Sequence, residues 1–459
     1  MQNNANKNDF LGSEPIGKLL FKLSIPTLLA QLINMLYNVV DRIYIGHMEG
    51  VGDLALTGVG VCMPLIMIVS AFAALVSSGG APRASIFMGK GDNETAEKTM
   101  GSCFTAQLVI SAILTAVLLI FSRDLLLAFG ASENTIDYAH GYMTVYAVGT
   151  VFVQLTLGMN SYITAQGFAK TSMLTTLIGA ILNIALDPLF IFGFGLGVRG
   201  AALATVISQA VSCLWVLLFL TGKRSILRLR PKNLIPDVSL LLPCLALGLA
   251  PFVMQSSESV IAVAFNSSLL EYGGDIAVGA MTILTSVMQL ALLPLQGLSQ
   301  GAQPITSYNF GAGRLDRVKQ SFRLLLTVSL SYSMAVWALA MLFPHVFASI
   351  FTSNSELIGF TAQALRVYAA SLGIFGIQMA CQMTFVSLGR AAESVVVAVM
   401  RKFILLLPLI FILPAFFADK TFAVYLAEPI ADAISVAFTA VLFAFRFKKL
   451  LKSAEAPRE

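Results

Sequence analysis

The sequence predicts an all-α polytopic membrane protein, with twelve transmembrane helices in two six-helix lobes related by a pseudo-two-fold axis. Three observations support this prediction: the composition is apolar, the apolar segments have the length of membrane helices, and the second half repeats the first. Hydrophobic residues make up 57% of the chain and charged residues 12%, with a mean hydropathy of +0.83. A soluble protein of 459 residues would be far less apolar.

The apolar segments are long enough to cross a bilayer as helices, which takes about 20 residues for a hydrocarbon core about 30 Å thick. They lack the alternation of apolar and polar residues that is typical of membrane barrel strands. In chain order, the predicted spans are residues 17–45, 54–79, 98–122, 136–158, 164–193, 197–221, 239–267, 276–300, 318–343, 355–384, 391–417 and 421–446.

Basic residues orient these spans, because Lys and Arg in short loops stay on the cytoplasmic side of a membrane. With both termini inside, the inner segments hold all but five of the 29 Lys and Arg residues, and we count Arg401 and Lys402 among the inner ones. The exceptions are Arg42, Arg123, Arg199, Arg366 and Lys420. We therefore expect a multi-pass protein of a prokaryotic plasma (inner) membrane with cytoplasmic termini. The net charge of +5 then reflects orientation and does not indicate nucleic-acid binding.

The chain repeats itself at a shift of 222 residues, without a gap. One shift superimposes two separated regions, which is hard to obtain by chance. The matched pairs are Gly52 and Gly274, Asp53 and Asp275, Ala55 and Ala277, Ser77 and Ser299, Gly79 and Gly301, Pro82 and Pro304, Ser85 and Ser307, Gly89 and Gly311, Gly91 and Gly313, Val145 to Ala147 and Val367 to Ala369, and Gly167 and Gly389.

Each copy contains six spans, so the second copy starts on the same side of the membrane as the first. Parallel repeats of this kind are related by an axis along the membrane normal and suit alternating access in secondary transporters. The predicted organisation is a cytoplasmic N-terminal tail at 1–16, an N-lobe at 17–221, a basic cytoplasmic connector at 222–238, a C-lobe at 239–447 and a cytoplasmic C-terminal tail at 448–459.

Asp187 lies within an apolar stretch, LIGAILNIALDPLFIFGFG, that is long enough to span the membrane. A carboxylate at mid-membrane depth costs roughly 2.5–3.5 kcal/mol on insertion scales, so it is expected to face the bundle interior or water. Asn183 is one helical turn earlier on the same face. Pro188 has no N–H, which leaves the carbonyl of Ile184 as a spare acceptor. These oxygen groups suit a small hard cation or a proton.

The first helix carries a polar stripe of Gln31, Asn34, Asn38 and Asp41, bordered by Tyr37. Their spacing places them along one side of a helix that is otherwise apolar. In lipid such a stripe must face inward, because unsatisfied polar groups in hydrocarbon cost several kcal/mol each.

Two structural alternatives compete with a functional stripe. Asn and Gln side chains often join packed membrane helices by hydrogen bonds. The two acids, Asp41 and Asp187, can also be neutralised by ion pairs with Arg42, Arg199 or Arg366.

Several motifs together resemble the multidrug and toxic compound extrusion family, and its DinF-like and MepA-like branch in particular. These motifs are VVDRIYIG at the first helix, LNIALDPLFIFG at the fifth, GAALAT at the sixth, and the repeated loops SSGGAPRASIFMGKGD and GLSQGAQPITSYNFGAGRLDRV. The resemblance covers about residues 15–447. It implies twelve helices in two lobes and export of amphipathic, often cationic compounds in exchange for Na⁺ or H⁺, with no other cofactor.

Carried over residue by residue, the resemblance implies a site for H⁺ or Na⁺ made by Asp41, Asn183, Asp187 and Thr205. The expected substrate cavity adds residues of the first, fourth, seventh and eighth helices. These are Gln31, Asn34, Tyr37, Asn38, Asn160, Glu258, Met288 and Gln289. Ordinary helix packing is the competing interpretation for Tyr37, Asn38, Asn160 and Met288.

The coupling hypothesis is that a proton or a sodium ion neutralises two carboxylates that cannot both stay charged in a poorly hydrated pocket. Cation entry then favours one arrangement of the bundle and a cationic substrate the other, which gives exchange. The repeat carries Asp187 onto Leu409, and aligning Pro26 with Pro251 carries Asp41 onto Asn266, so we expect one cation site, in the first lobe. Three roles are open to Glu258: a substrate counter-ion, a second coupling acid, or a packed acid paired with Arg366.

Two other functional classes are alternatives to export. A membrane-embedded enzyme is disfavoured, because the sequence has no HExxH motif, cysteine cluster or inward histidine. A flippase or exporter of lipid-linked or other amphipathic metabolites from the same superfamily fits the fold, but it would need a more cationic cavity for phosphate headgroups. Small organic molecules and membrane lipid are the expected partners, nucleic acid is not, and a monomer is the simplest assembly.

Overall fold

The computed structural model describes residues 9–455 of the 459-residue chain, and within those residues every regular element is a helix. The elements are α1 (Asp9–Ser13), α2 (Ile16–Gly46), α3 (Gly52–Gly89), α4 (Asn93–Ala128), α5 (Ile136–Ala165), α6 (Ala169–Pro188), η2 (Leu189–Gly193), α7 (Val198–Thr221), η3 (Pro231–Asn233), α8 (Val238–Gly311), α9 (Leu315–Leu342), α10 (Pro344–Ser349), α11 (Ser355–Tyr368), α12 (Leu372–Ser387), α13 (Ala391–Val399), η4 (Met400–Leu406), α14 (Leu407–Ile412), η5 (Leu413–Ala415) and α15 (Lys420–Glu455).

The predicted twelve spans are present within residues 9–455. Ten helices are each long and apolar enough to cross a membrane, and the pair α11 and α12 forms one more span, bent by 49°. The long helix α8 counts as two spans, because Gly274 interrupts it with a φ of 65°, a left-handed conformation that glycine adopts without strain. The all-α polytopic fold is therefore confirmed.

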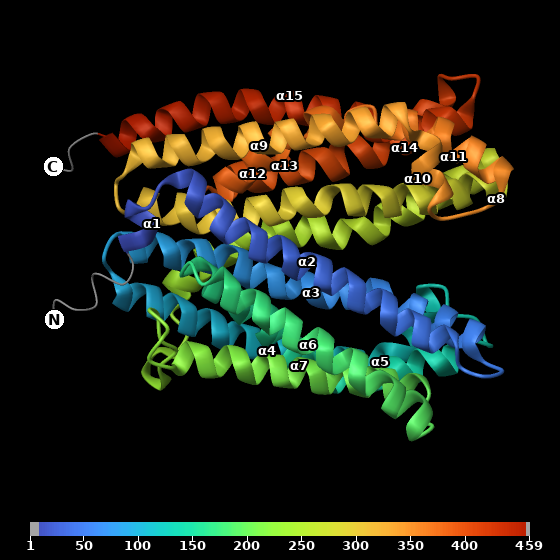
Figure 1. The fold of residues 1–459 in the computed structure, drawn as a ribbon, viewed down its shortest axis with the longest axis horizontal. Coiled ribbons are helices and arrows are strands. Elements are labelled where there is room, and N and C mark those ends of the chain that lie inside the picture. Colours follow the sequence, from blue (N-terminus) through green and yellow to red (C-terminus); the bar gives the residue numbers. More distant parts are fainter. Residues whose placement is uncertain (1–8, 456–459) are drawn as a thin grey trace.

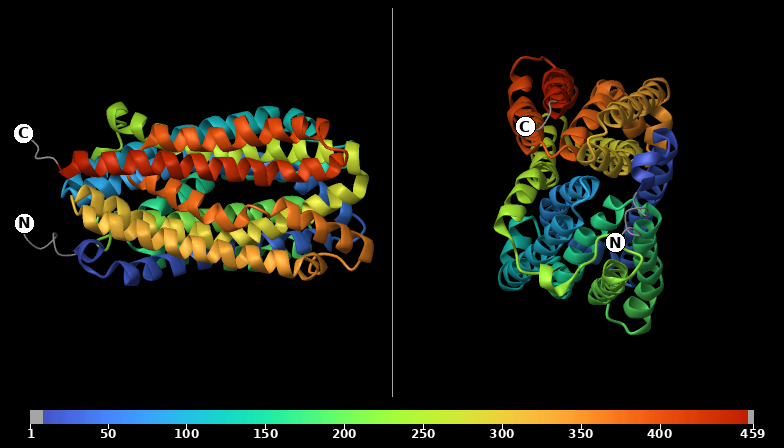
Figure 2. Two further views of the ribbon diagram at one scale, coloured as in Figure 1. Left: turned by 90° about the horizontal axis from the view of Figure 1, so that it is seen from above. Right: turned by 90° about the vertical axis from the view of Figure 1, so that its left-hand side faces the viewer.

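The helices form two elongated bundles that lie side by side, with α2 to α7 in one and α8 to α15 in the other (Figure 1). Helix α1 and the last turns of α15 lie at the same end of the molecule, called here the terminal end (Figures 1 and 2). An even number of spans requires this arrangement. Lys7 and Arg458, which belong to the predicted inner basic residues, lie outside the described residues.

Repeated glycines form the contacts between the two lobes, and they do so symmetrically. A Cβ at Gly79 of α3 would overlap the backbone of Cys244 in α8, and a Cβ at its repeat partner Gly301 would overlap the backbone of Ser24 in α2. The pseudo-two-fold relation thus explains why the same glycines recur. In both copies the backbone of a helix must come close to the backbone of a helix in the other lobe. A second symmetric couple consists of Gly89 against Tyr308 and Gly311 against Ile86.

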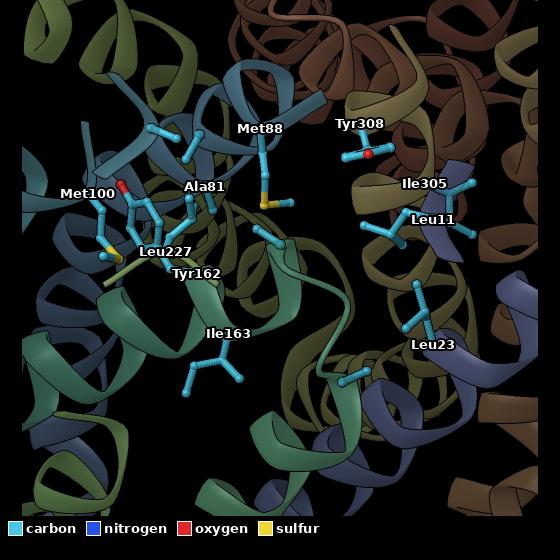
Figure 3. Packing of buried hydrophobic residues seen from close by; sticks show 14 of the residues in the cluster. Leu11, Leu23, Ala81, Met88, Met100, Tyr162, Ile163, Leu227, Ile305 and Tyr308 are labelled. Atoms are coloured by element: carbon cyan, nitrogen blue, oxygen red, sulfur yellow. The ribbon is translucent and has the colours of Figure 1, made fainter. Parts of the chain in front are cut away.

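Three large hydrophobic cores show where the lobes are joined. One core combines both lobes, and Leu11 and Leu23 pack there beside Ile305 and Tyr308 (Figure 3). A second core lies wholly within residues 261–431 and a third wholly within residues 45–202. The lobes therefore share apolar packing toward the terminal end and keep separate cores elsewhere.

Two predicted spans are less regular than the sequence indicated. The tenth span is the bent pair α11 and α12, and the eleventh is interrupted by the π-helix η4. The prediction that Arg401 and Lys402 lie on the cytoplasmic side was wrong, because both belong to η4, in the middle of the 391–415 span, and are buried. Each has an acidic partner in the membrane, which removes the cost of burying an unpaired charge.

The predicted N-terminal tail contains the short helix α1, which ties the first lobe to the second. Arg317 Nη2, at the start of α9, donates to the backbone oxygens of Glu14 at 2.6 Å and Leu11 at 3.3 Å. Asn309 Nδ2 of α8 also donates to Leu11 O, at 2.9 Å. Lys22 donates to the Glu14 carboxylate at 3.0 Å and thereby lowers the pKa of Glu14, so this pair is charged at neutral pH. At the other end of the chain, α15 continues into the predicted C-terminal tail as far as residue 455.

Replacing Arg317 with alanine should loosen the terminal end. Two partly buried carbonyls would lose a charged donor, which costs about 1–3 kcal/mol. The hydrogen-exchange rate of peptides covering residues 9–31 should increase by the factor that corresponds to this loss of free energy. Lys98→Ala, which removes an exposed ion pair with Glu94 on α4, is the control. Equal exchange in the Arg317 variant and the wild type would mean that α1 does not hold this end closed.

Candidate cation and substrate sites

Asn183, Asp187 and Thr205 meet where α6 packs against α7. Asn183 Nδ2 donates to Asp187 Oδ1 at 3.2 Å and to Thr205 Oγ1 at 3.4 Å. Pro188 ends α6, and the π-helix η2 follows, as expected where a proline removes a helical hydrogen bond. Asp187 is fully buried and Asn183 is 2% exposed, so their polar atoms are shielded from water.

Asp41 reaches the same place from α2, which packs along α6 and also touches α7. Its side chain is buried, and its charge acts directly on Asp187. The structure therefore brings together all four residues that the sequence assigns to a cation site. They come from the first, fifth and sixth spans, as the resemblance implied.

Three oxygens in this cluster are buried without a hydrogen-bond partner among the described residues: Asp41 Oδ1, Asn183 Oδ1 and Asp187 Oδ2. Buried acceptors of this kind are uncommon in native proteins and call for an ion, water or proton. Their chemistry, oxygen only, fits H⁺ or a hard cation such as Na⁺. Within residues 9–455, no group of three or more His, Cys, Asp or Glu side chains could hold a metal.

The structural alternative for the two acids, an ion pair with an arginine, is not found among the described residues. Arg42 acts on Asp41 without forming a salt bridge. Arg366 instead donates through Nε to the carbonyl of Met341 at 3.3 Å. Asp41 and Asp187 thus form an acid pair without a fixed basic partner.

Sequence reasoning missed the tyrosines that border this site. Tyr142 of α5 is buried beside the site and interacts with the charge of Asp41 and with Thr205. Its ring stacks on that of Tyr146, with 6.3 Å between centroids. The signal was present in the sequence, since Tyr138, Tyr142 and Tyr146 recur every four residues on one face of the fourth span.

The polar stripe of α2 runs from the lobe contact to the acid pair. Gln31 Nε2 faces Gln300 Oε1 of the second lobe at 3.4 Å. Further along, Asn38 is exposed and donates to the backbone oxygen of Asn34 at 2.7 Å, while Tyr37 is half-buried and close to Asp41. The stripe is therefore partly used for packing and partly open.

The remaining predicted cavity residues separate into packed and open positions. Asn160 Nδ2 donates to the carbonyl of Ser172 at 3.3 Å, and its Oδ1 is buried without a partner among the described residues. Met288 packs against the core of its own lobe. Gln289 is exposed.

Glu258 does not pair with Arg366, the partner that the sequence offered. Its Oε1 is 2.8 Å from Lys402 Nζ, and the Glu258 side chain is 52% exposed whereas that of Lys402 is 5% exposed. Glu258 therefore presents a carboxylate at an open surface and is anchored there by a buried lysine.

A larger ionic cluster surrounds Lys402 inside the second lobe. Arg401 Nε is 2.6 Å from Asp432 Oδ1, and Arg401 Nη2 is 3.1 Å from Glu428 Oε1. Its guanidinium also lies over the ring of Phe375, 4.7 Å from the centroid. The sequence analysis missed this cluster, although its two acids on α15 have the same four-residue spacing in an apolar stretch as Asn183 and Asp187 of the first lobe.

Comparison with known proteins places the chain in a family. A family model described as MatE matches residues 26–189 and 251–412, well over half of the chain. The two matched segments start at Pro26 and Pro251, one in each lobe. This chain belongs to the MatE family. The resemblance to multidrug and toxic compound extrusion proteins is thereby confirmed.

Relatives of known name carry the same family assignment over nearly their whole length. The Multidrug export protein MepA of Staphylococcus haemolyticus (strain JCSC1435) is 25% identical over 403 residues, 88% of each chain. The protein of the same name from Staphylococcus aureus (strain NCTC 8325 / PS 47) is 24% identical over 409 residues, 89% of each chain.

Solved structures share the fold of this MatE protein. A MATE crystal structure in the bent conformation has a TM-score of 0.91 and 23% identity, covering 99% of this chain and 100% of its own. An outward-facing multidrug resistance MATE family transporter has a TM-score of 0.90 and 23% identity, covering 98% and 99%. A Pyrococcus furiosus transporter of the MOP superfamily, described by a reverse polarity of its binding pocket that suggests a different function, has a TM-score of 0.89 and 23% identity, covering 97% and 99%. At these identities the likeness to solved structures shows the fold alone. The class of substrate must therefore be inferred from the charge of the site.

Proposed function

We propose that this MatE protein is a secondary active multidrug exporter that exchanges amphipathic, often cationic compounds for H⁺ or Na⁺ by alternating access of its two lobes. The observation that carries the proposal is the acid pair Asp41 and Asp187, buried without a fixed basic partner among the described residues and lined by unpaired oxygens. The MepA relatives, named as multidrug export proteins, agree with it.

The physical basis of exchange is a choice between two neutralising partners. Burying two carboxylates close together is costly unless a proton or a cation compensates their charge. Entry of H⁺ or Na⁺ between α2, α6 and α7 favours the bundle arrangement that closes around it. An organic cation favours the other arrangement, and differential affinity for two states is sufficient to couple the two fluxes.

Substrate is proposed to bind between the lobes, along the polar stripe of α2 and opposite Glu258. The lobes share their core toward the terminal end, so the separate cores leave room for a substrate toward the other end. Cytoplasmic termini, expected from the basic residues, would make this the outward-facing arrangement of a monomeric plasma-membrane protein. Glu258 supplies a counter-ion for a cationic group.

Lipid-linked anions are the alternative substrates, and the charge of the second lobe argues against them. Phosphate headgroups would need exposed basic groups at the lobe interface. Arg401 and Lys402 are the basic groups of the cluster that includes Glu258, but both are buried and each is engaged by an acid. The acid that remains exposed, Glu258, repels phosphate.

Transport in proteoliposomes tests the proposal. A fluorescent organic cation should be exported when either a Na⁺ gradient or a pH gradient is imposed alone, with the other ion equal on both sides. The effective gradient identifies the coupling ion. Export that follows neither gradient would reject secondary exchange, and preferential movement of a phosphorylated lipid would favour the flippase alternative.

Tyr142→Phe should weaken cation binding without abolishing export. The variant loses the hydroxyl that interacts with Thr205 and with the charge of Asp41, and one polar interaction of this kind contributes about 0.5–1.5 kcal/mol. The ion concentration for half-maximal export should rise about 2- to 10-fold, since 1.4 kcal/mol corresponds to about tenfold. Tyr146→Phe, in the stacked neighbouring ring, is the matched control. Equal ion dependence in both variants would remove Tyr142 from the site.

A further inference from the structure

The ionic cluster of the second lobe is built on the same three helices of the repeat as the cation site of the first. Its residues come from the first part of α8, from η4 and from α15, which are the seventh, eleventh and twelfth spans. The first-lobe site uses α2, α6 and α7, the first, fifth and sixth spans. Arg401 lies eight residues before Leu409, the repeat position of Asp187, so the second cluster sits roughly 12 Å closer to the terminal end at 1.5 Å per residue.

The two sites differ in how their acids are neutralised. Asp41 and Asp187 have no salt bridge to a basic side chain among the described residues, whereas each acid of the second cluster has one. Arg401 bonds to Asp432 and Glu428, and Lys402 bonds to Glu258 and also acts on Glu428.

Charge is balanced within the buried part of the second cluster. Arg401, Lys402, Glu428 and Asp432 are all buried, and they comprise two bases and two acids. The third acid, Glu258, is the exposed member and carries the remaining negative charge. The buried set is therefore neutral without any bound ion.

We propose that Arg401 is a built-in cation, which takes in the second lobe the role that an exchangeable H⁺ or Na⁺ takes in the first. The proposal rests on the exchange function proposed above. It assigns cation binding to the first lobe alone and predicts one exchangeable cation per transport cycle. Arg401 is a positioning residue: it holds η4 against α15 throughout the cycle and contacts no substrate.

The geometry around the guanidinium of Arg401 is that of a cation site that the guanidinium itself occupies. Two carboxylates accept from two different nitrogens of Arg401, and Phe375 covers one face of its plane. The guanidinium is planar, permanently charged and able to bond to two carboxylates at once. It therefore suits such a position better than an ion that must dissociate from the site. The π-helix η4 places Arg401 and Lys402, which are adjacent in sequence, toward different acids.

Counting bound ions tests the proposal. Purified protein in lipid nanodiscs is assayed with ²²Na⁺ at pH 8 and by proton titration from pH 5 to pH 8, and bound ions of both kinds are summed. Arg401→Gln should bind one cation more than the wild type, because it leaves two buried acids with one base. The double variant Arg401→Gln/Asp432→Asn restores neutrality and should return to the wild-type count. A folded Arg401→Gln protein with no extra ion would overturn the proposal.

Single acid variants give a second readout if Arg401→Gln does not fold. Asp432→Asn and Glu428→Gln each leave Arg401 one partner, so both should bind as many ions as the wild type. Loss of an ion in either variant would show an exchangeable cation in the second lobe and contradict the proposal. Asp41→Asn separates the two hypotheses: it should lose one ion, and failure to do so would reject the first-lobe site whatever the Arg401 variants show.

Discussion

Asp41→Asn is expected to reduce gradient-driven export to the level of protein-free liposomes, while the protein still inserts and folds. The amide keeps the size of the side chain but cannot release a proton or neutralise a sodium ion. Because an unpaired buried carboxylate is costlier than a buried amide, the variant should be at least as stable as the wild type. Uptake of an organic cation and thermal unfolding, measured on the same preparation, check both expectations.

The matched control is Asp53→Asn, which removes an exposed carboxylate at the start of α3. It should leave export unchanged. Full gradient-driven export by Asp41→Asn at normal expression would remove the acid pair from the coupling mechanism, although the fold would stand.

Gly79→Ala should prevent the lobes from meeting at the terminal end. The added Cβ would overlap the carbonyl oxygen of Cys244, and neither backbone can move without separating α3 from α8. Overpacking of this kind costs about 1–3 kcal/mol, which lowers the population of the closed arrangement about 5- to 150-fold. Export should fall accordingly, because alternating access requires both arrangements.

Spin labels at Lys90→Cys and Asp316→Cys report the separation of the two lobes at that end. The native cysteines in the described chain are all buried and should remain unlabelled. The label distance should increase in Gly79→Ala and stay unchanged in Gly60→Ala, whose Cβ on the same helix meets nothing within 4 Å. Identical distances in both variants would show that the glycine contact does not control closure.

The sequence was sufficient to predict the fold, because bilayer length, basic-residue distribution and internal repetition constrain it strongly. Two of the glycine pairs matched by the repeat, Gly79 with Gly301 and Gly89 with Gly311, proved to lie at contacts between the lobes. The irregular places were harder to predict: the bend between α11 and α12 and the π-helix η4 arise from packing between helices, which periodicity within one segment does not record.

The first-lobe site was predictable because a buried acid is costly and Asn183 and Asp187 share a helix face. The rotation of each helix about its own axis decides which residues of other helices complete the site. The sequence does not show this rotation, so Tyr142 was missed. Arg401 and Lys402 were misplaced for a related reason. The rule that basic residues mark the cytoplasmic side assumes unpaired charges, and it fails when acids on another span, here Glu428 and Asp432, neutralise them.

The attachment of α1 to the far lobe has a consequence for biosynthesis. Leu11 leaves the ribosome well before its partner Asn309, which follows 298 positions later. Domains generally fold in the order of their synthesis, so the first lobe must insert with this segment still unattached. Ribosomal stalling before the eighth span is complete would therefore yield a nascent chain in which α1 has no docking place, and quality-control proteases would find it accessible.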